Sequence, residues 1–316
     1  MTNIGSNFKT ISLVIPVFNN ELSLKPLAEE LLNLSKNLST VGVKLELIFV
    51  DDGSTDNSYK VLCSFLEYFE KIKVLKLARN FGAVNASRTG TRFVSGDAFS
   101  VLAADLQDPP DLVLSMTKEW LLGSKFVICE RLTRKDPLIT KFFAKLHYFS
   151  LRTLVFPDYP KGGFDLALID SSLLDTINES VKSGSVPLLA FSLGIKPRIL
   201  RYDRPRRLHG KSSWTFVKKF NFFLDLMFGY SNKPLRFISF VGISVALLSF
   251  IYGAKVTLNA ILNQVAIPGF SAIASLLSFL TGLTLLMLGI IGEYLWRIYE
   301  EVNRRPAATI DAIIEK

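Results

Sequence analysis

Residues Val101-Leu-Ala-Ala-Asp-Leu-Gln-Asp-Pro-Pro110 decide how the rest of this chain is interpreted. The stretch begins as a short apolar run, typical of a buried strand, and changes to acidic and amide side chains before two prolines end any strand pairing. In an open α/β sheet, ligand groups lie at the carboxyl ends of parallel strands. The side-chain oxygens of Asp105 and Gln107 suit Mg²⁺ or Mn²⁺ bound together with a diphosphate. An ordinary strand followed by a polar turn is the alternative.

Residues 11–129 alternate between short β-branched apolar runs and longer segments whose apolar residues recur at helical spacing. Strands are expected at Ile11–Val17, Leu45–Val50, Ile72–Leu77, Ala98–Ala103 and Phe126–Cys129. Helices are expected between them, at Leu22–Leu38, Asp56–Phe69, Phe81–Val94 and Asp111–Leu122. This order predicts βαβ units, and therefore an α/β fold with a mostly parallel, Rossmann-like sheet covered on both faces. Right-handed crossovers then bring the ends of strands one, two and four to one edge.

Polar clusters follow four consecutive predicted strands. They are Pro16-Val-Phe-Asn-Asn-Glu21, Val50-Asp-Asp-Gly-Ser-Thr-Asp56, Ala78-Arg-Asn-Phe-Gly82 and the stretch quoted first. In the second cluster Gly53 permits a tight turn, and Ser54 or Thr55 can cap the next helix. Because loops are polar anyway, one such cluster would mean little. Four at one edge of a sheet indicate a binding site.

Composition and charge favour a protein at the cytoplasmic face of a membrane. The chain has 316 residues, 49% of them hydrophobic, and a net charge of +9. Seven basic residues lie between Arg201 and Lys219, just before the apolar region, where they suit anionic lipid headgroups and phosphates rather than nucleic acid. Cys63 and Cys129 lack metal-binding spacing and indicate reduced core thiols. The polar N-terminus predicts no cleaved signal peptide.

Two uncharged stretches, Phe237–Ala254 and Phe270–Gly292, are long enough to span a bilayer. Their 18 and 23 residues make helices of roughly 27 and 34 Å, against a hydrocarbon core of about 30 Å. Their connection carries no charge and basic residues flank their outer ends, so both termini are expected in the cytoplasm. This predicts a multi-pass protein of the inner (plasma) membrane with a transmembrane hairpin at about 237–257 and 270–292. A buried soluble hairpin is the alternative.

The expected organisation has four parts. Residues 1–213 form the cytoplasmic α/β domain, 214–235 a juxtamembrane helix and linker, 236–296 the two spans, and 297–316 a cytoplasmic tail. As helices, residues 137–156 and 214–228 each show an apolar and a basic face, which is typical of helices lying in the bilayer surface. Ordinary core helices are the alternative for both.

The motifs resemble those of a known family. VDDGSTD, IPVFNNE, ARNFG and ADLQDPP, followed by an apolar hairpin, are similar to inverting family 2 glycosyltransferases of GT-A fold. The similarity is greatest to the polyprenyl-phosphate branch, which includes dolichol-phosphate mannose synthases and bacterial GtrB-type glucosyltransferases. It covers nearly the whole chain. It implies transfer of a hexose, with glucose from UDP-glucose favoured, to undecaprenyl or another polyprenyl phosphate, with a divalent cation, Mg²⁺ or Mn²⁺, as cofactor.

The resemblance also implies roles for individual residues. The nucleotide sugar would be bound by Pro16, Phe18, Glu21, Asp51, Asp52 and Arg79, and the cation by Asp105 and Gln107. The acceptor phosphate would be bound by Arg131, Arg134, Arg204, Arg207 and Ser212. Arginine forks suit phosphate oxygens, although contact with lipid headgroups remains an alternative for the basic run. The chain departs from the family at Ala103, where many relatives have Asp, at Phe18 (Tyr) and at Ser213 (Lys).

The expected acceptor bears on the mechanism. A phosphate monoester has a second pKa near about 6 and is mostly dianionic at neutral pH, so it is already a nucleophile. Catalysis by Asp105 and the arginines would then rest on positioning and charge neutralisation, with in-line attack inverting the anomeric carbon. Asp158 and Asp165 are further candidates for a base or a sugar-binding group, with structural turn residues as the alternative.

Two other functions are alternatives to this one. A processive polysaccharide synthase is disfavoured because the chain lacks a Q-x-x-R-W motif and has only two predicted spans. A non-catalytic membrane scaffold that binds a nucleotide sugar is suggested only by Ala103. A homo-oligomer is expected because most oligomeric proteins are of this kind.

Overall fold

The computed structural model describes residues 8–131, 149, 151–160, 162–180, 184–203, 270–303 and 308–316, with 233, 236–238, 240–245, 247–248, 251 and 255. The chain divides into two compact units. One consists of Met1–Asn221 with Arg305–Lys316, and the other of Phe222–Arg304. The first unit holds every strand in the described part of the chain.

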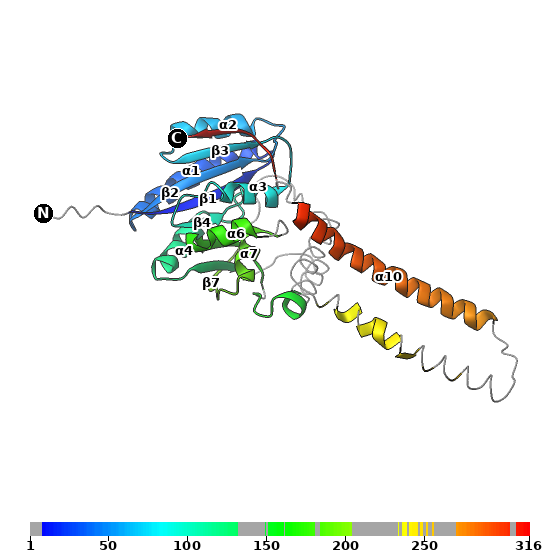
Figure 1. Cartoon of the computed structure of the whole chain (residues 1–316). Coiled ribbons are helices and arrows are strands. Elements are labelled where there is room, and N and C mark those ends of the chain that lie inside the picture. Colours follow the sequence, from blue (N-terminus) through cyan, green and yellow to red (C-terminus); the bar gives the residue numbers. More distant parts are fainter. Residues whose placement is uncertain are drawn as a thin grey trace. The chain divides into compact units, whose positions relative to one another are not determined.

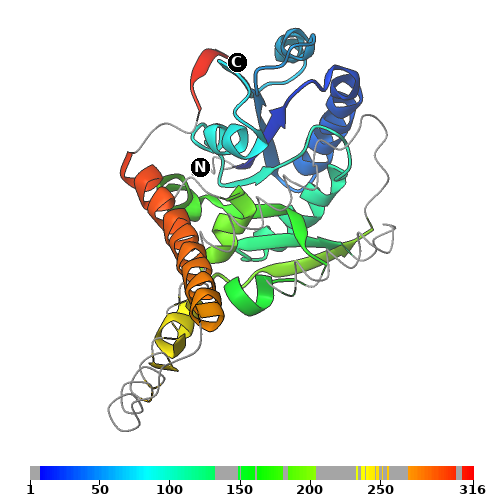
Figure 2. The same ribbon diagram turned by 90° about the vertical axis from the view of Figure 1, so that its right-hand side faces the viewer.

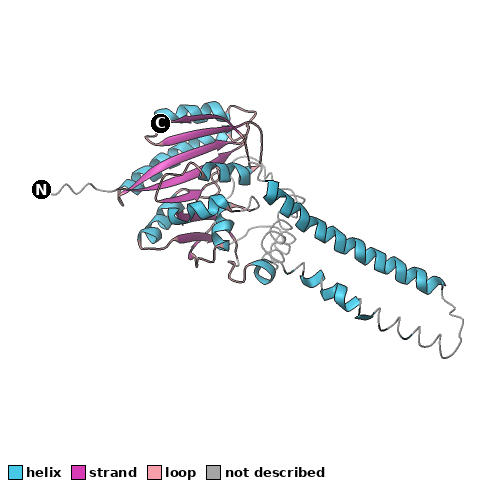
Figure 3. Cartoon of the chain, viewed as in Figure 1, coloured by secondary structure: helices cyan, strands magenta, loops and turns pink. Residues whose placement is uncertain are grey.

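An eight-stranded sheet with the order β7-β5-β6-β4-β1-β2-β3-β8 forms the body of the first unit (Figure 1, Figure 3). The strands are β1 (Lys9–Val17), β2 (Val43–Asp51), β3 (Ile72–Leu77), β4 (Ala98–Val101), β5 (Phe126–Arg131), β6 (Phe164–Asp170), β7 (Arg198–Tyr202) and β8 (Ile310–Glu315). Strands β1 to β4 pair in parallel, as do β5 and β7. Only β6 and β8 run antiparallel to their neighbours. The expected mostly parallel sheet is confirmed.

Helices cover both faces of this sheet. The helices α1 (Glu21–Ser39), α2 (Ser58–Ser64) and α4 (Asp111–Leu121) lie on one face. The other face carries α3 (Ala83–Thr91), α6 (Leu174–Glu179) and α7 (Val186–Ser192). The five strands and four helices expected between residues 11 and 129 are all present, with ends that differ by a few residues.

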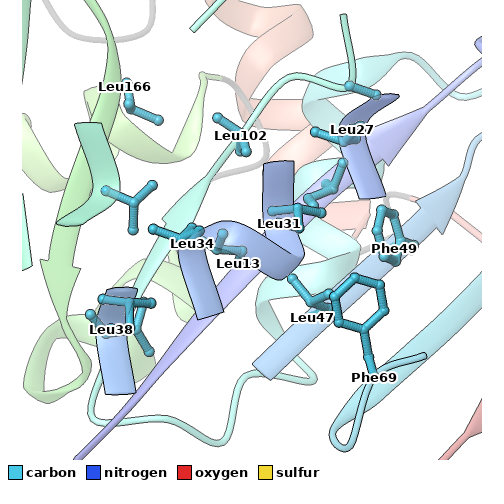
Figure 4. Packing of buried hydrophobic residues seen from close by; sticks show 14 of the residues in the cluster. Leu13, Leu27, Leu31, Leu34, Leu38, Leu47, Phe49, Phe69, Leu102 and Leu166 are labelled. Carbon is cyan, nitrogen blue, oxygen red and sulfur yellow. The ribbon is translucent and has the colours of Figure 1, made fainter. Parts of the chain in front are cut away.

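A row of leucines on α1 anchors that helix to the sheet. Its members are spaced three or four residues apart and are fully buried: Leu24, Leu27, Leu31, Leu34 and Leu38. Figure 4 shows the last four leucines of this row near Leu13, Leu47 and Phe49 of the strands. Each such burial stabilises the fold by about 1.5–3 kcal/mol. The row therefore fixes the start of α1 and the loop that precedes it.

A buried acidic group joins three segments within the sheet. The Glu46 carboxylate on β2 is fully buried and accepts hydrogen bonds from the Ser12 hydroxyl and from the backbone N–H and hydroxyl of Ser95, the latter two at 2.9 and 2.7 Å. The Lys73 ammonium lies 3.3 Å from it. Burial alone would raise the pKa of Glu46, but these hydrogen bonds and the charge of Lys71 outweigh that effect and lower it. The group ties the loop before β4 to β1 and β2.

The apolar pattern does not predict β6, β7 or β8. The last of these is formed by residues expected only as a tail, and it pairs antiparallel with β3 at the edge of the sheet. The backbone N–H of Ile72 donates to the Lys316 carbonyl at 3.2 Å, and the Lys316 N–H donates back at 2.9 Å. The chain therefore returns to the sheet after the whole of the second unit.

The second unit contains one helix in the described residues that is long and apolar enough to cross a membrane. This is α10 (Phe270–Asn303), unbroken over 34 residues, with its most apolar window at Phe279–Trp296 (Figure 1, Figure 2). The helix continues past the expected end at Gly292 because no glycine or proline follows within it. A shorter apolar helix, Arg236–Val245, lies within the first predicted span. A hairpin of two membrane helices stays a prediction.

These two apolar helices touch each other. A Cβ atom added to Gly242 would lie 2.8 Å from the Met287 methyl carbon of α10. The lack of a side chain at Gly242 therefore leaves room for the tip of the Met287 side chain. Of the two expected surface helices, 214–228 lies outside the described residues, and 137–156 is described only at 149 and 151–156, where Leu151–Val155 forms a π-helical turn.

Candidate active site

The carboxyl ends of six strands and the amino end of β6 share one edge of the sheet. This follows from the pairing, because β1 to β5 and β7 run in one direction and β6 runs in the other. The sequence-predicted residues at this edge are Pro16, Phe18, Glu21, Asp51, Asp52, Arg79, Asp105, Gln107, Arg131 and Asp165. The expected gathering of strand ends at one edge is confirmed. Arg134, Arg204, Arg207 and Ser212 lie outside the described residues.

The loops after β1 and β2 are joined by hydrogen bonds between side chains and backbone. Asn19 has a positive φ of 51°, its N–H donates to the Ser54 hydroxyl at 3.0 Å, and its side-chain oxygen accepts from Thr55 N–H at 2.8 Å. The Glu21 carboxylate accepts from both the backbone and side-chain nitrogens of Asn57, the former at 3.1 Å. Glu21, expected in the nucleotide pocket, thus holds the start of α2 in place.

The adjacent carboxylates of the VDDGS loop are both buried but differ in their partners. Asp52 accepts from the backbone N–H groups of Phe81 and Gly82, one on each oxygen, at 2.7 and 2.9 Å. Asp51 accepts from Ser54 N–H at 3.4 Å, and among the described residues its Oδ2 has no hydrogen-bond partner. Burial raises the pKa of both groups, and in Asp52 the two N–H donors oppose that rise. Asp52 therefore fixes the loop after β3.

The backbone of the VDDGS loop also lies directly against the loop after β3. Gly53 has a φ of +67°, and a Cβ atom built there would lie 2.5 Å from the Arg79 carbonyl carbon and 2.7 Å from Asn80 N. Glycine is the residue that tolerates both the left-handed backbone and this close approach. Three loops of the site are thus held together: the first two by Asn19 and Glu21, the last two by Asp52 and Gly53.

An exposed cationic and aromatic group lies on these fixed loops. The Arg79 guanidinium is exposed and lies 4.6 Å from the centroid of the Phe81 ring. The Phe18 ring, just past the end of β1, is 44% exposed. Aromatic faces can stack on a nucleobase, and a guanidinium can bind phosphate oxygens in a bidentate manner. These side chains remain available to a ligand, whereas Glu21 and Asp52 are engaged within the protein.

The turn after β4 presents Asp105 and Gln107 in a strained backbone. Leu106 between them has a φ of 57°, which is rare for a bulky side chain. The Gln107 N–H donates to Asp105 Oδ1 at 3.2 Å. Both side chains are partly exposed, and their oxygens are of the hard type that Mg²⁺ and Mn²⁺ accept. Within the described part of the chain, no group of three or more His, Cys, Asp or Glu converges.

Glu130, near the end of β5, is a carboxylate at this edge that the sequence patterns did not identify. Its two oxygens accept from Gly162 N–H at 3.0 Å and from the Arg201 Nε–H at 3.3 Å. Glu130 thereby connects β7 to the loop 156–163, which carries the exposed Asp158. Asp165 follows as the second residue of β6, at the same edge as Asp105. A charged residue inside an apolar strand was the signal that could have identified Glu130.

The expectation of reduced thiols agrees with the structure. Cys63 and Cys129 are both free, and Cys129 is fully buried on β5. Burial, together with the negative charge of Asp108, raises the pKa of Cys129 to about 12. The thiol therefore stays protonated and acts as a core residue.

An α/β sheet covered on both faces, with acidic loops at one edge, is typical of a GT-A-like domain, and the chain also contains an apolar helical unit. The chain belongs to glycosyl transferase family 2, and the model of that family matches residues 12–171. The protein is therefore a glycosyltransferase. The matched range includes every predicted nucleotide and cation residue.

Relatives of similar length extend the similarity through the apolar region. An uncharacterized glycosyltransferase of Synechocystis sp. is 33% identical over 94% of this chain and 93% of its own. The undecaprenyl-phosphate 4-deoxy-4-formamido-L-arabinose transferase of Photorhabdus laumondii is 30% identical over 97% and 94%. A prophage bactoprenol glucosyl transferase homolog of Escherichia coli is 28% identical over 96% and 99%. The resemblance to the polyprenyl-phosphate branch is confirmed by these names.

Solved structures match this chain more distantly. Glucosyl-3-phosphoglycerate synthase of Mycobacterium tuberculosis, in complex with Mn²⁺, UDP-glucose and phosphoglyceric acid, has a TM-score of 0.47 and 17% identity over 70% of this chain and 78% of its own. S. aureus TarS in complex with UDP-GlcNAc has a TM-score of 0.46 and 15% identity over 69% and 65%.

Proposed function

We propose that this glycosyltransferase transfers a hexose from a nucleotide sugar, with UDP-glucose favoured, to the phosphate of undecaprenyl or another polyprenyl phosphate, with inversion at the anomeric carbon. The observation that carries the proposal is the similarity over 97% of the chain to a relative named for an undecaprenyl-phosphate acceptor. The extent of this similarity matters, because it includes the apolar region as well as the first unit (Met1–Asn221 with Arg305–Lys316), called the catalytic unit below. Glucose is favoured by the relative named as a bactoprenol glucosyl transferase homolog.

The loops after β1, β2 and β3 would bind the nucleotide. The exposed Phe18 ring and the Arg79 guanidinium are the groups that can contact a base or a diphosphate, and Pro16 borders them at the end of β1. Glu21, Asp51 and Asp52 are assigned a different part, because their carboxylates are buried or bonded to the neighbouring loops. They would keep the pocket in its binding shape without contacting the nucleotide.

The turn after β4 would hold the divalent cation. Asp105 and Gln107 supply oxygen ligands, and Ala103 leaves the site one carboxylate short of the D-x-D-x-Q pattern. The donor set still fits, since Mg²⁺ commonly uses one or two carboxylates together with substrate phosphates and water. When bound, the cation would neutralise charge on the donor diphosphate. The chain's own part is to present the two side chains on the strained turn at Leu106.

The acceptor side would be formed by the ends of β5, β6 and β7. Arg131 ends β5, and the basic residues Arg134, Arg204 and Arg207 follow in sequence with Ser212. A lipid phosphate dianion is a sufficient nucleophile without a general base. Asp158 and Asp165 are then assigned to sugar binding or positioning, with Glu130 holding the loop between them through Gly162.

The return of the chain to the sheet supports an even number of membrane crossings. Strands β7 and β8 belong to one sheet, so the segments before and after the second unit lie on the same side of any membrane. If α10 crosses, the chain must cross once more between residues 203 and 270. This supports a two-span hairpin, with the catalytic unit and both termini in the cytoplasm of a cell with an inner membrane.

Labelling of single cysteines tests that topology. In a chain lacking Cys63 and Cys129, an Asn263→Cys variant is expected to react with an impermeant maleimide added outside intact cells. A Lys316→Cys variant should react only after permeabilisation. Equal labelling at both positions in intact cells would contradict the hairpin.

A purified-enzyme assay tests the function. The full chain in detergent is incubated with undecaprenyl phosphate and a panel of labelled UDP- and GDP-sugars, with and without EDTA. We expect a lipid-linked hexose from UDP-glucose that disappears with EDTA. If no donor yields a sugar-lipid in the presence of metal, the proposal is wrong. UDP binding by calorimetry without turnover would favour a non-catalytic scaffold. The oligomeric state is measured on the same sample by light scattering, with a homo-oligomer expected.

The cation turn has a sharper test. Asp105→Asn preserves size but removes the carboxylate charge, and we expect turnover to fall by about 10²-fold or more, as for loss of a group that stabilises developing charge. The thermal midpoint should not change, since the side chain is partly exposed. Asp111→Asn, at the exposed first residue of α4, is the matched control and should retain wild-type activity. Activity within a few-fold for Asp105→Asn would show that the assignment is wrong.

A further inference from the structure

A buried hydrogen bond connects the cation turn to the strand that leads into the predicted acceptor segment. Asp108 directly follows Gln107 and is 3% exposed, and Tyr202 is the last residue of β7 and is 7% exposed. The Tyr202 hydroxyl donates to Asp108 Oδ1 across 94 residues of sequence. Asp108 is part of the ADLQDPP motif but has no role implied by the resemblance, Tyr202 belongs to none of the motifs, and both side chains are buried.

The positions of the two residues give this contact its meaning. Asp108 lies one residue past Gln107 and just before the two prolines that precede α4, so it shares the backbone of the turn that presents Asp105 and Gln107. On the other side, Tyr202 pairs in parallel register with Arg131 at the end of β5. Two residues after Tyr202 the sequence enters the basic stretch that contains Arg204 and Arg207.

From this juxtaposition we propose that Asp108 and Tyr202 form a positioning pair, which holds the ends of β5 and β7, and with them the proposed acceptor-phosphate residue Arg131, in register with the turn that binds the donor diphosphate. The proposal rests on the function proposed above and deepens it. In-line transfer requires the attacking phosphate and the anomeric carbon to be held at near-contact distance, and small displacements of one reactant cost large factors in rate. A link between the donor and acceptor loops supplies that alignment without touching either substrate.

The chemistry of the pair suits this role. A carboxylate with almost no exposure is stable only when its oxygens are hydrogen-bonded, so the position of Asp108 depends on groups such as the tyrosine hydroxyl. A hydrogen bond to an ionised acceptor is shorter and stronger than one between neutral groups. Tyr202 also packs within the main apolar cluster, which fixes its ring independently of the hydroxyl. Loss of the hydroxyl alone should therefore loosen the turn and leave the strand in place.

The principal variant is Tyr202→Phe, which keeps the ring and removes the hydroxyl. We expect kcat for transfer to undecaprenyl phosphate to fall about ten- to a hundred-fold, while UDP affinity measured by calorimetry stays within two-fold. Tyr68→Phe is the control, because it makes the same chemical change at a side chain that is 62% exposed. Loss of folded protein alone would lower the apparent kcat and the calorimetric stoichiometry of UDP binding by the same factor.

A double-mutant cycle tests whether the two residues act as one unit. Tyr202→Phe combined with Asp108→Ala should lower kcat no further than Asp108→Ala alone. Asp108→Asn, whose amide oxygen can still accept from the tyrosine, should retain more activity than Asp108→Ala. Wild-type kcat in Tyr202→Phe, or additive losses in the double variant, would overturn the proposal.

A second readout does not depend on lipid chemistry. Hydrogen–deuterium exchange of the backbone N–H groups of the cation turn, residues 105–108, is measured by mass spectrometry on the full chain in detergent. It should be at least five-fold faster in Tyr202→Phe than in wild type and unchanged in Tyr68→Phe. Equal rates in all three proteins would overturn the positioning role. If wild type makes no lipid-linked sugar, the proposed function fails, and the exchange comparison still decides whether Tyr202 fixes the cation turn.

Discussion

Asp51 and Asp52 are neighbours with similar burial, yet their contacts predict opposite outcomes for the same isosteric substitution. Asp52→Asn replaces one of two oxygens with an NH₂ group that faces a backbone N–H donor, at Phe81 or at Gly82. This removes a charge-assisted hydrogen bond, worth about 1.5–3 kcal/mol, and leaves a buried donor unpaired, at about 1–3 kcal/mol. We expect a loss of about 3 kcal/mol in the free energy of unfolding of the catalytic unit.

Asp51→Asn should be neutral or should stabilise the protein by up to about 1 kcal/mol. In the described structure its Oδ2 has no hydrogen-bond partner, and its Oδ1 accepts from Ser54 N–H at 3.4 Å, a hydrogen bond that an amide oxygen can also accept. The substitution removes a buried charge. Because burial raises the pKa of Asp51, its carboxyl stabilises the fold below the ordinary aspartate pKa and loses that contribution as pH rises through the folded value. The advantage of Asp51→Asn over wild type should therefore grow from acid towards neutral pH.

Pulse proteolysis across a urea series measures both variants on the full chain in detergent. UDP calorimetry on the same samples should show affinity reduced about ten-fold for Asp52→Asn, since the loop that carries Arg79 is then less well fixed, and unchanged for Asp51→Asn. Stability within 1 kcal/mol of wild type for Asp52→Asn would falsify the assignment. So would a larger loss in Asp51→Asn than in Asp52→Asn.

Three further substitutions, one of them with a matched control, each test the contacts of a single residue. Gly53→Ala should lower the free energy of unfolding by more than about 2 kcal/mol, because it adds a Cβ atom 2.5 Å from a backbone atom at an unfavourable φ. Its control, Gly42→Ala, has a φ of +72° in open space and should cost only the roughly 1–2 kcal/mol of the backbone conformation. Urea unfolding compares the two variants. Glu46→Gln should lower the free energy of unfolding by about 3 kcal/mol at neutral pH. Because the pKa of Glu46 is lowered in the folded protein, the stability difference between variant and wild type should shrink as pH falls through the folded pKa. Urea unfolding from pH 7 to 3 measures this difference. Asp311→Asn breaks an exposed ion pair with Lys76 and should lower the free energy of unfolding, measured with urea, by less than about 0.5 kcal/mol. A larger loss would mean that β8 depends on this pair.

The sequence was sufficient for the parallel half of the sheet. Strands such as β1 and β2 are mostly apolar and largely buried, and the helix between them carries leucines at helical spacing, so period and length agree. It was not sufficient for β7 and β8. The former reads Arg-Ile-Leu-Arg-Tyr with two charges, and the latter pairs with a strand more than 230 residues earlier, which no local pattern encodes.

The motifs located the candidate site but did not assign its contacts. Glu21 and Asp52 lie at the predicted edge, but each is bonded to a loop about 30 residues away in sequence, at Asn57 and at Phe81. A carboxylate that binds a ligand and one that braces a loop have the same sequence signature. They differ only in which donors the fold brings to them. Glu130 and Asp108 were overlooked for the same reason, since their partners on β7 are visible only in three dimensions.

The edge strand β8 sets an order of events during synthesis. Its partner β3 leaves the ribosome more than 230 residues before β8 does, and the whole apolar unit is made in between. Until then β3 presents unpaired backbone groups, the kind of edge that recruits other chains into aggregates. The sheet is therefore completed only after the apolar unit has been made. A chain arrested within the apolar unit would retain an open β3 edge, so completion of the sheet depends on synthesis of the apolar unit as well as on the final strand.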